Sequence, residues 1–170
     1  MRTILFTLLC AMTLFAADPP RRAPGFSLPD VKMEWHDLAD FRGKPMILEF
    51  MQTTCPHCAS FAEVLDKVQK KFGNKVGILS VCNPPDDPRS IASYITGHKI
   101  AYPVVYDTGQ VAYSYLRIAQ FDLPQVFVID ANGMIQRHFE YGAMTRDIFE
   151  GNGLLSEIER VLAGAIPAKK

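Results

Sequence analysis

Short, nearly uninterrupted apolar runs mark the predicted strands of this 170-residue chain. Runs of this kind are typical of strands that are buried on both faces, as in a parallel sheet. The last two runs are separated by Asn132-Gly133, a turn signal that predicts an antiparallel hairpin. The predicted strands are 46–51, 76–81, 103–106, 125–130 and 134–139.

Apolar residues between these runs recur every three to four positions, and this spacing predicts helices. The clearest helix is predicted over 56–72, where Gly73-Asn74 provides the stop. Thr145 is predicted to cap a C-terminal helical region that is interrupted at 151–153. Shorter helices are predicted over 89–95 and 110–117.

The order of these elements predicts an α/β sandwich with a mixed central sheet. A strand–helix–strand unit comes first, and a strand–helix insertion, a hairpin and a closing helix follow it. Residues 18–25, DPPRRAPG, predict an extended N-terminal lead-in.

The first 16 residues have the pattern of a secretory signal peptide. Arg2 precedes an apolar run over 4–16 that is short for a membrane span, and cleavage is predicted after Ala16. An uncleaved anchor is the alternative. We therefore predict a signal peptide over 1–16, one domain over 17–170 and a periplasmic or otherwise extracytoplasmic location.

The charges of the chain balance, with 18 Lys and Arg against 18 Asp and Glu. A nearly neutral chain without a basic cluster gives no reason to propose a nucleic-acid partner. We expect a monomer.

The segment 53–61, TTCPHCASF, places two cysteines where a predicted strand passes into a predicted helix. Pro56 suits the first turn of that helix, where its missing N–H costs nothing. Cys55 would face free helix N–H groups and the positive end of the helix dipole, which favour a thiolate. We predict that Cys55 attacks and that Cys58, one turn further in, resolves the mixed disulfide.

His57 bears on the redox potential of this pair. A cation beside the thiolate would stabilise the reduced form and make the disulfide a stronger oxidant, by about 30 mV for roughly 1.4 kcal/mol. The alternative is a histidine that only begins the helix.

Other uses of the two cysteines fit the sequence less well. A structural disulfide across so short a loop would remove little chain entropy. A zinc site would need a second ligand pair, and Cys82, His36, His98 and His138 have no recognised spacing. Covalent haem attachment would need histidine at position 59, which is Ala59. We predict redox chemistry with neither metal nor organic cofactor.

The motifs around this pair resemble those of the thioredoxin-like superfamily. EFMQTTCPHC (49–58) resembles the thioredoxin active-site segment, and FDLPQVFVIDANG (121–133) resembles the segment with the cis-proline. APGFSLPDV, DFRGKP and the extra strand–helix unit between residues 82 and 107 resemble the secreted TlpA/ResA-like branch. The resemblance covers about residues 23–142 and implies a thioredoxin-like three-layer sandwich. The Pro-His dipeptide instead resembles dithiol oxidases such as DsbA, so the direction of electron flow stays open.

The resemblance also implies roles for single residues. Pro124 would be the cis-proline that faces the cysteine pair, and the backbone of Leu123, with Pro56, would contact a substrate chain added as a strand. Glu49 would be a buried acid with a raised pKa that takes the proton of Cys58. The alternatives are an ordinary trans proline, and a carboxylate paired with a surface lysine.

Together these features predict an exported thiol–disulfide oxidoreductase with protein thiols and disulfides as substrates and a membrane-bound redox partner. A redoxin-type thiol peroxidase is the alternative, but its threonine three positions before the reactive cysteine is replaced by Gln52. A non-enzymatic holder of metal or unfolded chains is the third hypothesis.

Cys82 is expected to be a packed free thiol, with a redox relay as the alternative. Tyr113 and Tyr115 are expected to pack rather than bind substrate.

Overall fold

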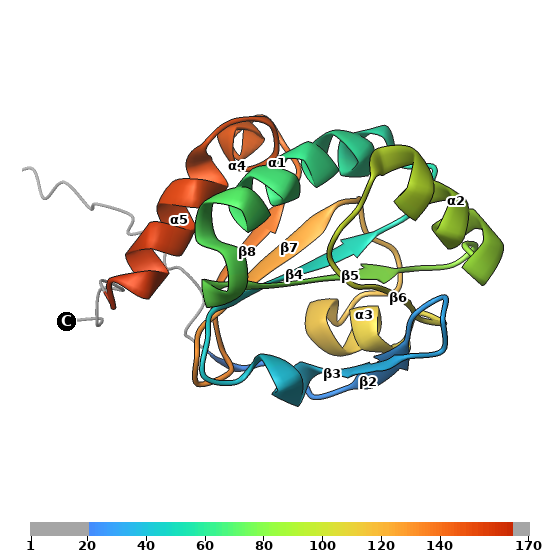
Figure 1. Ribbon diagram of the computed structural model, residues 1–170, viewed down its shortest axis with the longest axis horizontal. Coiled ribbons are helices and arrows are strands. Elements are labelled where there is room, and N and C mark those ends of the chain that lie inside the picture. The colour runs from blue at the N-terminus through green and yellow to red at the C-terminus, as the bar shows by residue number, and fades with distance from the viewer. Residues whose placement is uncertain (1–20, 165–170) are drawn as a thin grey trace, which may run out of the picture.

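The computed structural model describes residues 21–164, and the predicted signal peptide lies outside them. A six-stranded mixed sheet in the order β1-β8-β7-β4-β5-β6 forms the middle layer. Helices α1, α2, α4 and α5 cover one face, and α3 with the β2–β3 hairpin covers the other (Figure 1). The predicted three-layer thioredoxin-like sandwich is therefore confirmed.

The strands of the main sheet are β1 (Arg21–Arg22), β4 (Met46–Met51), β5 (Gly77–Cys82), β6 (Val104–Tyr106), β7 (Gln125–Ile129) and β8 (Met134–Glu140), and the hairpin consists of β2 (Ser27–Pro29) and β3 (Trp35–Asp37). The helices are α1 (Pro56–Phe72), α2 (Pro88–His98), α3 (Gln110–Leu116), α4 (Arg146–Glu150) and α5 (Gly153–Leu162), with short 3-10 turns at Leu38–Phe41 and Gly73–Lys75.

Strand β4 lies at the centre of the sheet, parallel to β5 and antiparallel to β7. Every residue of these three strands is buried, as the apolar runs predicted. The predicted bounds of β4 are confirmed, and β5 begins and ends one residue later than predicted. Strand β6 pairs in parallel with β5, so the predicted insertion extends the sheet by one strand.

Helix α1 also has its predicted bounds. Its apolar residues Phe61, Leu65 and Val68 are fully buried against the sheet. Gly73 ends the helix with a φ of +53°, a conformation that glycine adopts without steric cost. The first turn of α1 therefore stands at the carboxyl end of the central strand, where the two cysteines lie.

The bounds of α2 and the cap of α4 differ from the prediction. Helix α2 covers Pro88–His98 and is longer than predicted. Asp87 and Ser90 form a reciprocal capping box at its start, and the backbone N–H of Lys99 closes its end on the carbonyls of Ile95 and Thr96. Thr145 does precede α4, but its hydroxyl donates to the carbonyl of Glu140 at 2.5 Å. The prediction that its side chain caps the helix was therefore wrong, since that oxygen binds the preceding turn and makes no bond to the first N–H groups of α4.

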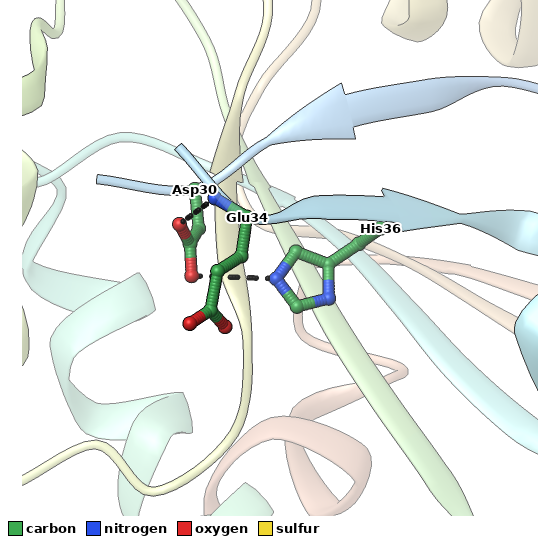
Figure 2. Close-up of side chains that lie close together, drawn as sticks. All are labelled: Asp30, Glu34 and His36. Atoms are coloured by element: carbon green, nitrogen blue, oxygen red, sulfur yellow. Dashed lines mark hydrogen bonds and ion pairs between the residues drawn. The ribbon is translucent and has the colours of Figure 1, made fainter. Parts of the chain in front are cut away.

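The β2–β3 hairpin contains a small cluster of potential metal ligands. The side chains of Asp30, Glu34 and His36 offer donor atoms within 4.8 Å of one another (Figure 2). Asp30 accepts the backbone N–H groups of Lys32 and Glu34 and lies 3.3 Å from the His36 ring. Burial raises its pKa, but these bonds outweigh burial and the pKa is lowered overall. The contacts of the hairpin turn account for this arrangement.

Within residues 21–164, no helix has the length and apolar character that a membrane span requires.

Candidate active site

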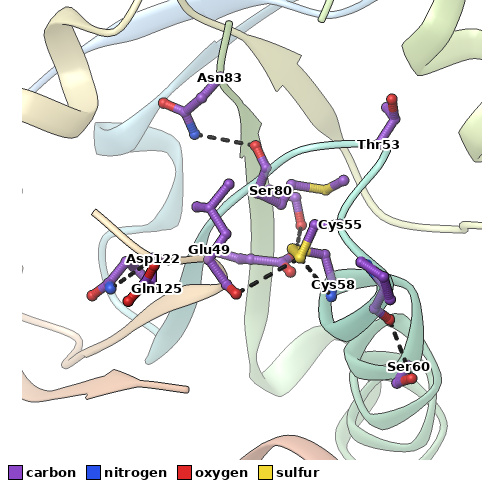
Figure 3. The surroundings of a disulfide bond; sticks show 12 residues. Glu49, Thr53, Cys55, Cys58, Ser60, Ser80, Asn83, Asp122 and Gln125 are labelled. Carbon is purple, nitrogen blue, oxygen red and sulfur yellow. Dashed lines mark hydrogen bonds between the residues drawn. A yellow bond between two sulfur atoms is a disulfide. The ribbon is translucent and has the colours of Figure 1, made fainter. Parts of the chain in front are cut away.

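Cys55 and Cys58 lie where β4 passes into α1 and are joined by a disulfide, with their Cα atoms 5.3 Å apart (Figure 3). Cys55 occupies the N-cap of α1, and its Sγ accepts the backbone N–H of Cys58 at 3.1 Å. Pro56 follows at the first helical position, as predicted. The structure therefore places Cys55 at the positive end of the helix, where a thiolate is favoured.

The two sulfurs differ in exposure. Cys55 is half-buried, whereas Cys58 is completely buried. The turn that carries Cys58 is anchored from α2, because the Tyr94 hydroxyl donates to the Cys58 carbonyl at 3.2 Å. An external thiol or disulfide can thus approach Cys55 but not Cys58.

The peptide bond between Leu123 and Pro124 is cis, which confirms the predicted isomer. Cys55 Sγ lies 3.7 Å from the Leu123 carbonyl oxygen, although the two residues are 68 positions apart. Strand β7 begins its pairing at Gln125, so Leu123 precedes the paired part of that strand. The fold thus brings the predicted cis-proline segment against the reactive cysteine.

Glu49 lies in the central strand, one layer below the cysteines. Alternation along β4 places it on the same face as Ile47 and Met51, whose apolar cluster includes Cys58. Its side chain is 1% exposed, and Ser80 donates a hydrogen bond to Oε2 at 2.5 Å. The other oxygen, Oε1, has no partner among the described residues.

The pKa of Glu49 is raised to about 7, because the cost of burying the charge exceeds the stabilisation from Ser80. The alternative of a carboxylate paired with a surface lysine is wrong, since the group is buried in a central strand. A carboxyl group that titrates near neutral pH can both accept and return a proton there.

His57 is exposed and stacks on Tyr141, with ring centroids 3.9 Å apart and planes 19° from parallel. The Tyr141 hydroxyl donates to Glu150 at 2.7 Å, and Arg146 binds the other Glu150 oxygen. The bonds from Arg146 and Tyr141 lower the pKa of Glu150, and the charge of His57 adds to this effect. Neither Tyr141 nor Glu150 lies in a motif that could have been recognised from the sequence, and both come from the segment after β8.

Asp86 fixes the loop before the cysteines and was also missed from sequence. Its carboxylate accepts the backbone N–H of Thr53 at 2.7 Å, the Thr53 hydroxyl at 2.5 Å and the Ser90 hydroxyl at 3.0 Å. Cys82 is a buried free thiol, as predicted, and its Sγ lies 3.6 Å from Asp86. Burial, followed by the charge of Asp86, raises the Cys82 pKa, so this thiol is held protonated.

Gln52 stands where a redoxin-type peroxidase would need threonine. Its side-chain amide donates to the carbonyl of Pro84. Gln52 therefore binds the loop that follows β5, and this contact does not favour the peroxidase alternative.

The geometry of the cysteine site agrees with the similarity of this sequence to known proteins. The model of the AhpC/TSA family matches residues 19–138. The chain belongs to this family. Among its relatives is the thiol-disulfide oxidoreductase ResA of Geobacillus kaustophilus, which is 31% identical over 131 residues, covering 75% of this chain and 72% of the relative. The protein is therefore a thioredoxin-like thiol–disulfide oxidoreductase, as predicted.

Solved structures share the fold. A putative thiol:disulfide interchange protein DsbE from Chlorobium tepidum superposes with a TM-score of 0.70 at 21% identity, covering 84% of this chain and 99% of that one. A secreted disulfide oxidoreductase of Mycobacterium tuberculosis, homologous to E. coli DsbE, gives a TM-score of 0.64 at 20% identity, covering 76% and 95%. Both similarities support the thioredoxin-like sandwich.

Proposed function

We propose that this enzyme is exported and exchanges disulfides with protein thiols through the Cys55–Cys58 pair. The observation that carries the proposal is the half-buried Cys55 sulfur at the N-terminus of α1, beside the Leu123 carbonyl. The signal-like residues 1–16 support export. We further propose a single domain over 17–170 and a membrane-bound partner that restores the redox state.

In the reducing direction, the Cys55 thiolate attacks one sulfur of a substrate disulfide and releases the other as a thiolate. Cys58 then attacks Cys55 Sγ, the mixed disulfide breaks, and the second substrate thiol leaves. The enzyme gains the disulfide that the substrate loses. The oxidising direction is the reverse, with a substrate thiolate attacking Cys55 and Cys58 leaving.

Glu49 is assigned to the proton transfer at the buried cysteine, Cys58. Cys58 must lose a proton to attack, and water has little access to a completely buried thiol. We assign the proton to Glu49, whose pKa of about 7 and position on the same face of the sheet suit the task. In the oxidising direction Glu49 returns the proton to Cys58.

We assign substrate binding to Leu123, Pro124 and Pro56. An extended substrate chain would lie beside Leu123, whose backbone precedes the paired part of β7. We assign His57 a role in setting the reduction potential of the cysteine pair, because it lies between the two cysteines in the sequence and is held by its stack on Tyr141.

The test is to trap the mixed disulfide on a protein substrate. Reduced Cys58→Ser enzyme, mixed with insulin, is expected to form a covalent adduct that dithiothreitol releases and that mass spectrometry assigns to Cys55. The matched Cys55→Ser variant is expected to form none. Adducts of equal yield on both variants would overturn the assignment of the attacking sulfur.

Export is tested separately by expressing the full chain in a bacterial host, fractionating the cells and sequencing the N-terminus. A mature chain that begins at Ala17 in the periplasmic fraction is expected. An intact N-terminus in the cytoplasmic fraction would contradict export.

A further inference from the structure

The proton that Glu49 takes from Cys58 must reach solvent before the next reaction cycle, yet both side chains are buried. The two carboxyl oxygens of Glu49 differ in their contacts. Ser80 donates a hydrogen bond to Oε2 at 2.5 Å, whereas Oε1 has no partner among the described residues and is left to receive the proton of Cys58. The Ser80 hydroxyl is therefore the first group through which the proton can leave.

The sheet leads from Ser80 to Tyr102. Ser80 lies opposite Glu49 on one side and opposite Val104 on the other, and its backbone N–H donates to the Pro103 carbonyl at 3.1 Å. Tyr102 comes two residues before Val104, so its side chain extends from the same face, and both belong to the apolar cluster on that face. A diagonal neighbour at this spacing is within reach of an aromatic side chain.

The hydroxyl groups of Ser80 and Tyr102 interact. Burial raises the pKa of Tyr102, the charge of Glu49 raises it further, and a side-chain hydrogen bond with Ser80 lowers it by less than burial raises it. The phenol therefore stays protonated and can pass a proton on without ionising. A second buried tyrosine near Glu49, Tyr94, instead donates its hydroxyl hydrogen to the Cys58 carbonyl.

Tyr102 lines a small hollow at the surface, between α1 and the segment that follows α2. Its volume of about 10 Å³ is close to the minimum that one water molecule needs. The Asp66 carboxylate is half-exposed there, and its charge acts on Tyr102. The lining residues are Ala62, Asp66, Gln69, His98, Lys99, Ile100, Ala101 and Tyr102.

We propose that Ser80 and Tyr102 form the path by which protons pass between Glu49 and this hollow. The carboxyl group rotates to present its proton to Ser80 Oγ, Ser80 gives its own proton to the Tyr102 oxygen, and Tyr102 gives its own to water that enters the hollow. One proton enters the path and one leaves it, so both hydroxyl groups end neutral. The oxidising direction uses the same steps in reverse. The inference rests on the proposed function and deepens it, because it names the proton route of the same site.

The experiment follows one turnover of the reduced enzyme with 5,5′-dithiobis(2-nitrobenzoate) in a stopped-flow instrument. Cys55 attacks the reagent and releases one thionitrobenzoate, and Cys58 then releases the second, so that the enzyme disulfide forms as the reagent disulfide is reduced. The reaction is run in weak buffer at pH 8, above the Glu49 pKa of about 7, so that the proton of Cys58 ends in solvent. A pH-indicator dye records its arrival while thionitrobenzoate absorbance records the chemistry.

In the wild-type protein the dye signal is expected to coincide with release of the second thionitrobenzoate. Tyr102→Phe keeps the ring and removes only the hydroxyl, and its dye signal is expected to lag at least about fivefold behind that release, because the proton must wait for a local opening of the structure. The ratio of the two rates within one variant is independent of any overall change in its activity.

Tyr115→Phe is the matched control. Tyr115 is a buried tyrosine in the cluster on the opposite face of the sheet, and its hydroxyl donates to the Pro24 carbonyl at 2.9 Å. Its two signals are expected to coincide, as in the wild-type protein.

Coincident signals in Tyr102→Phe, or an equal lag in Tyr115→Phe, would overturn the proton path and leave the proposed function intact. Release of a single thionitrobenzoate by the wild-type protein, with the reagent still bound to Cys55 by mass spectrometry, would instead overturn the proposed function and this inference with it.

Discussion

Substituting Glu49 with glutamine is expected to change how the stability of the oxidised protein depends on pH. Glutamine keeps the size of the side chain and can accept the hydrogen bond from Ser80, but it cannot ionise. The oxidised state is the right one to test, because no cysteine of the pair titrates in it. The difference between the wild-type and variant proteins therefore isolates the carboxyl group.

The magnitude follows from the raised pKa. Below pH 4.5 the carboxyl is protonated in both the folded and the unfolded chain. Between pH 4.5 and about 7 the unfolded chain releases this proton and the folded chain keeps it, so the folded state loses stability as the pH rises. At about 1.4 kcal/mol per pH unit, the loss over this range is about 3 kcal/mol, and it is complete above pH 7.

Urea unfolding of the two oxidised proteins between pH 4 and 8 provides the assay. The free energy of unfolding of wild-type protein, relative to Glu49→Gln, is expected to fall by about 3 kcal/mol between pH 4.5 and 7. Ser80→Ala is the companion variant, because losing the bond to the charged form raises the Glu49 pKa further. Its decline is expected to continue above pH 7. Parallel curves for wild-type protein and Glu49→Gln would refute the reasoning.

Three further predictions concern the surroundings of the cysteines. His57→Ala is expected to lower the reduction potential of the pair by about 30 mV in glutathione equilibration, since a ring that can place a positive charge beside the thiolate is lost; an unchanged potential would limit His57 to its stack on Tyr141. Asp86→Asn is expected to lower the free energy of unfolding by about 1–3 kcal/mol in urea, because asparagine keeps only one acceptor oxygen and one of the two bonds from Thr53 loses its acceptor; equal stability would contradict this. In reduced native protein, iodoacetamide is expected to modify buried Cys82 at least about 100-fold more slowly than Cys55; equal rates would show that Cys82 is accessible.

The sequence predicted the centre of the fold well, because its signals there are local and agree with one another. Strand β4 and helix α1 have their predicted bounds, since a buried apolar run meets a proline start and a glycine stop. Helix α2 was predicted too short, although Asp87 and Ser90 supplied a capping signal. The cap at Thr145 failed because its hydroxyl binds the Glu140 carbonyl, a contact that depends on the turn after β8.

The same distinction between local signals and contacts formed only in the folded chain holds for the active site. Cys55, Cys58 and Pro124 could be predicted because short motifs carry them, and the structure brings the two segments together. Tyr141 and Asp86 could not, because each reaches the site from a separate loop and neither lies in a recognisable motif.

The central claim is that the start of α1 makes Cys55 the nucleophile. Its most direct test is the pKa of Cys55, read from thiolate absorbance near 240 nm during a pH titration of the reduced protein, with Cys58→Ser used to assign the signal. We predict a midpoint below about 7, against roughly 8.5 for a free cysteine. A Cys55 midpoint at or above about 8.5 would contradict the account.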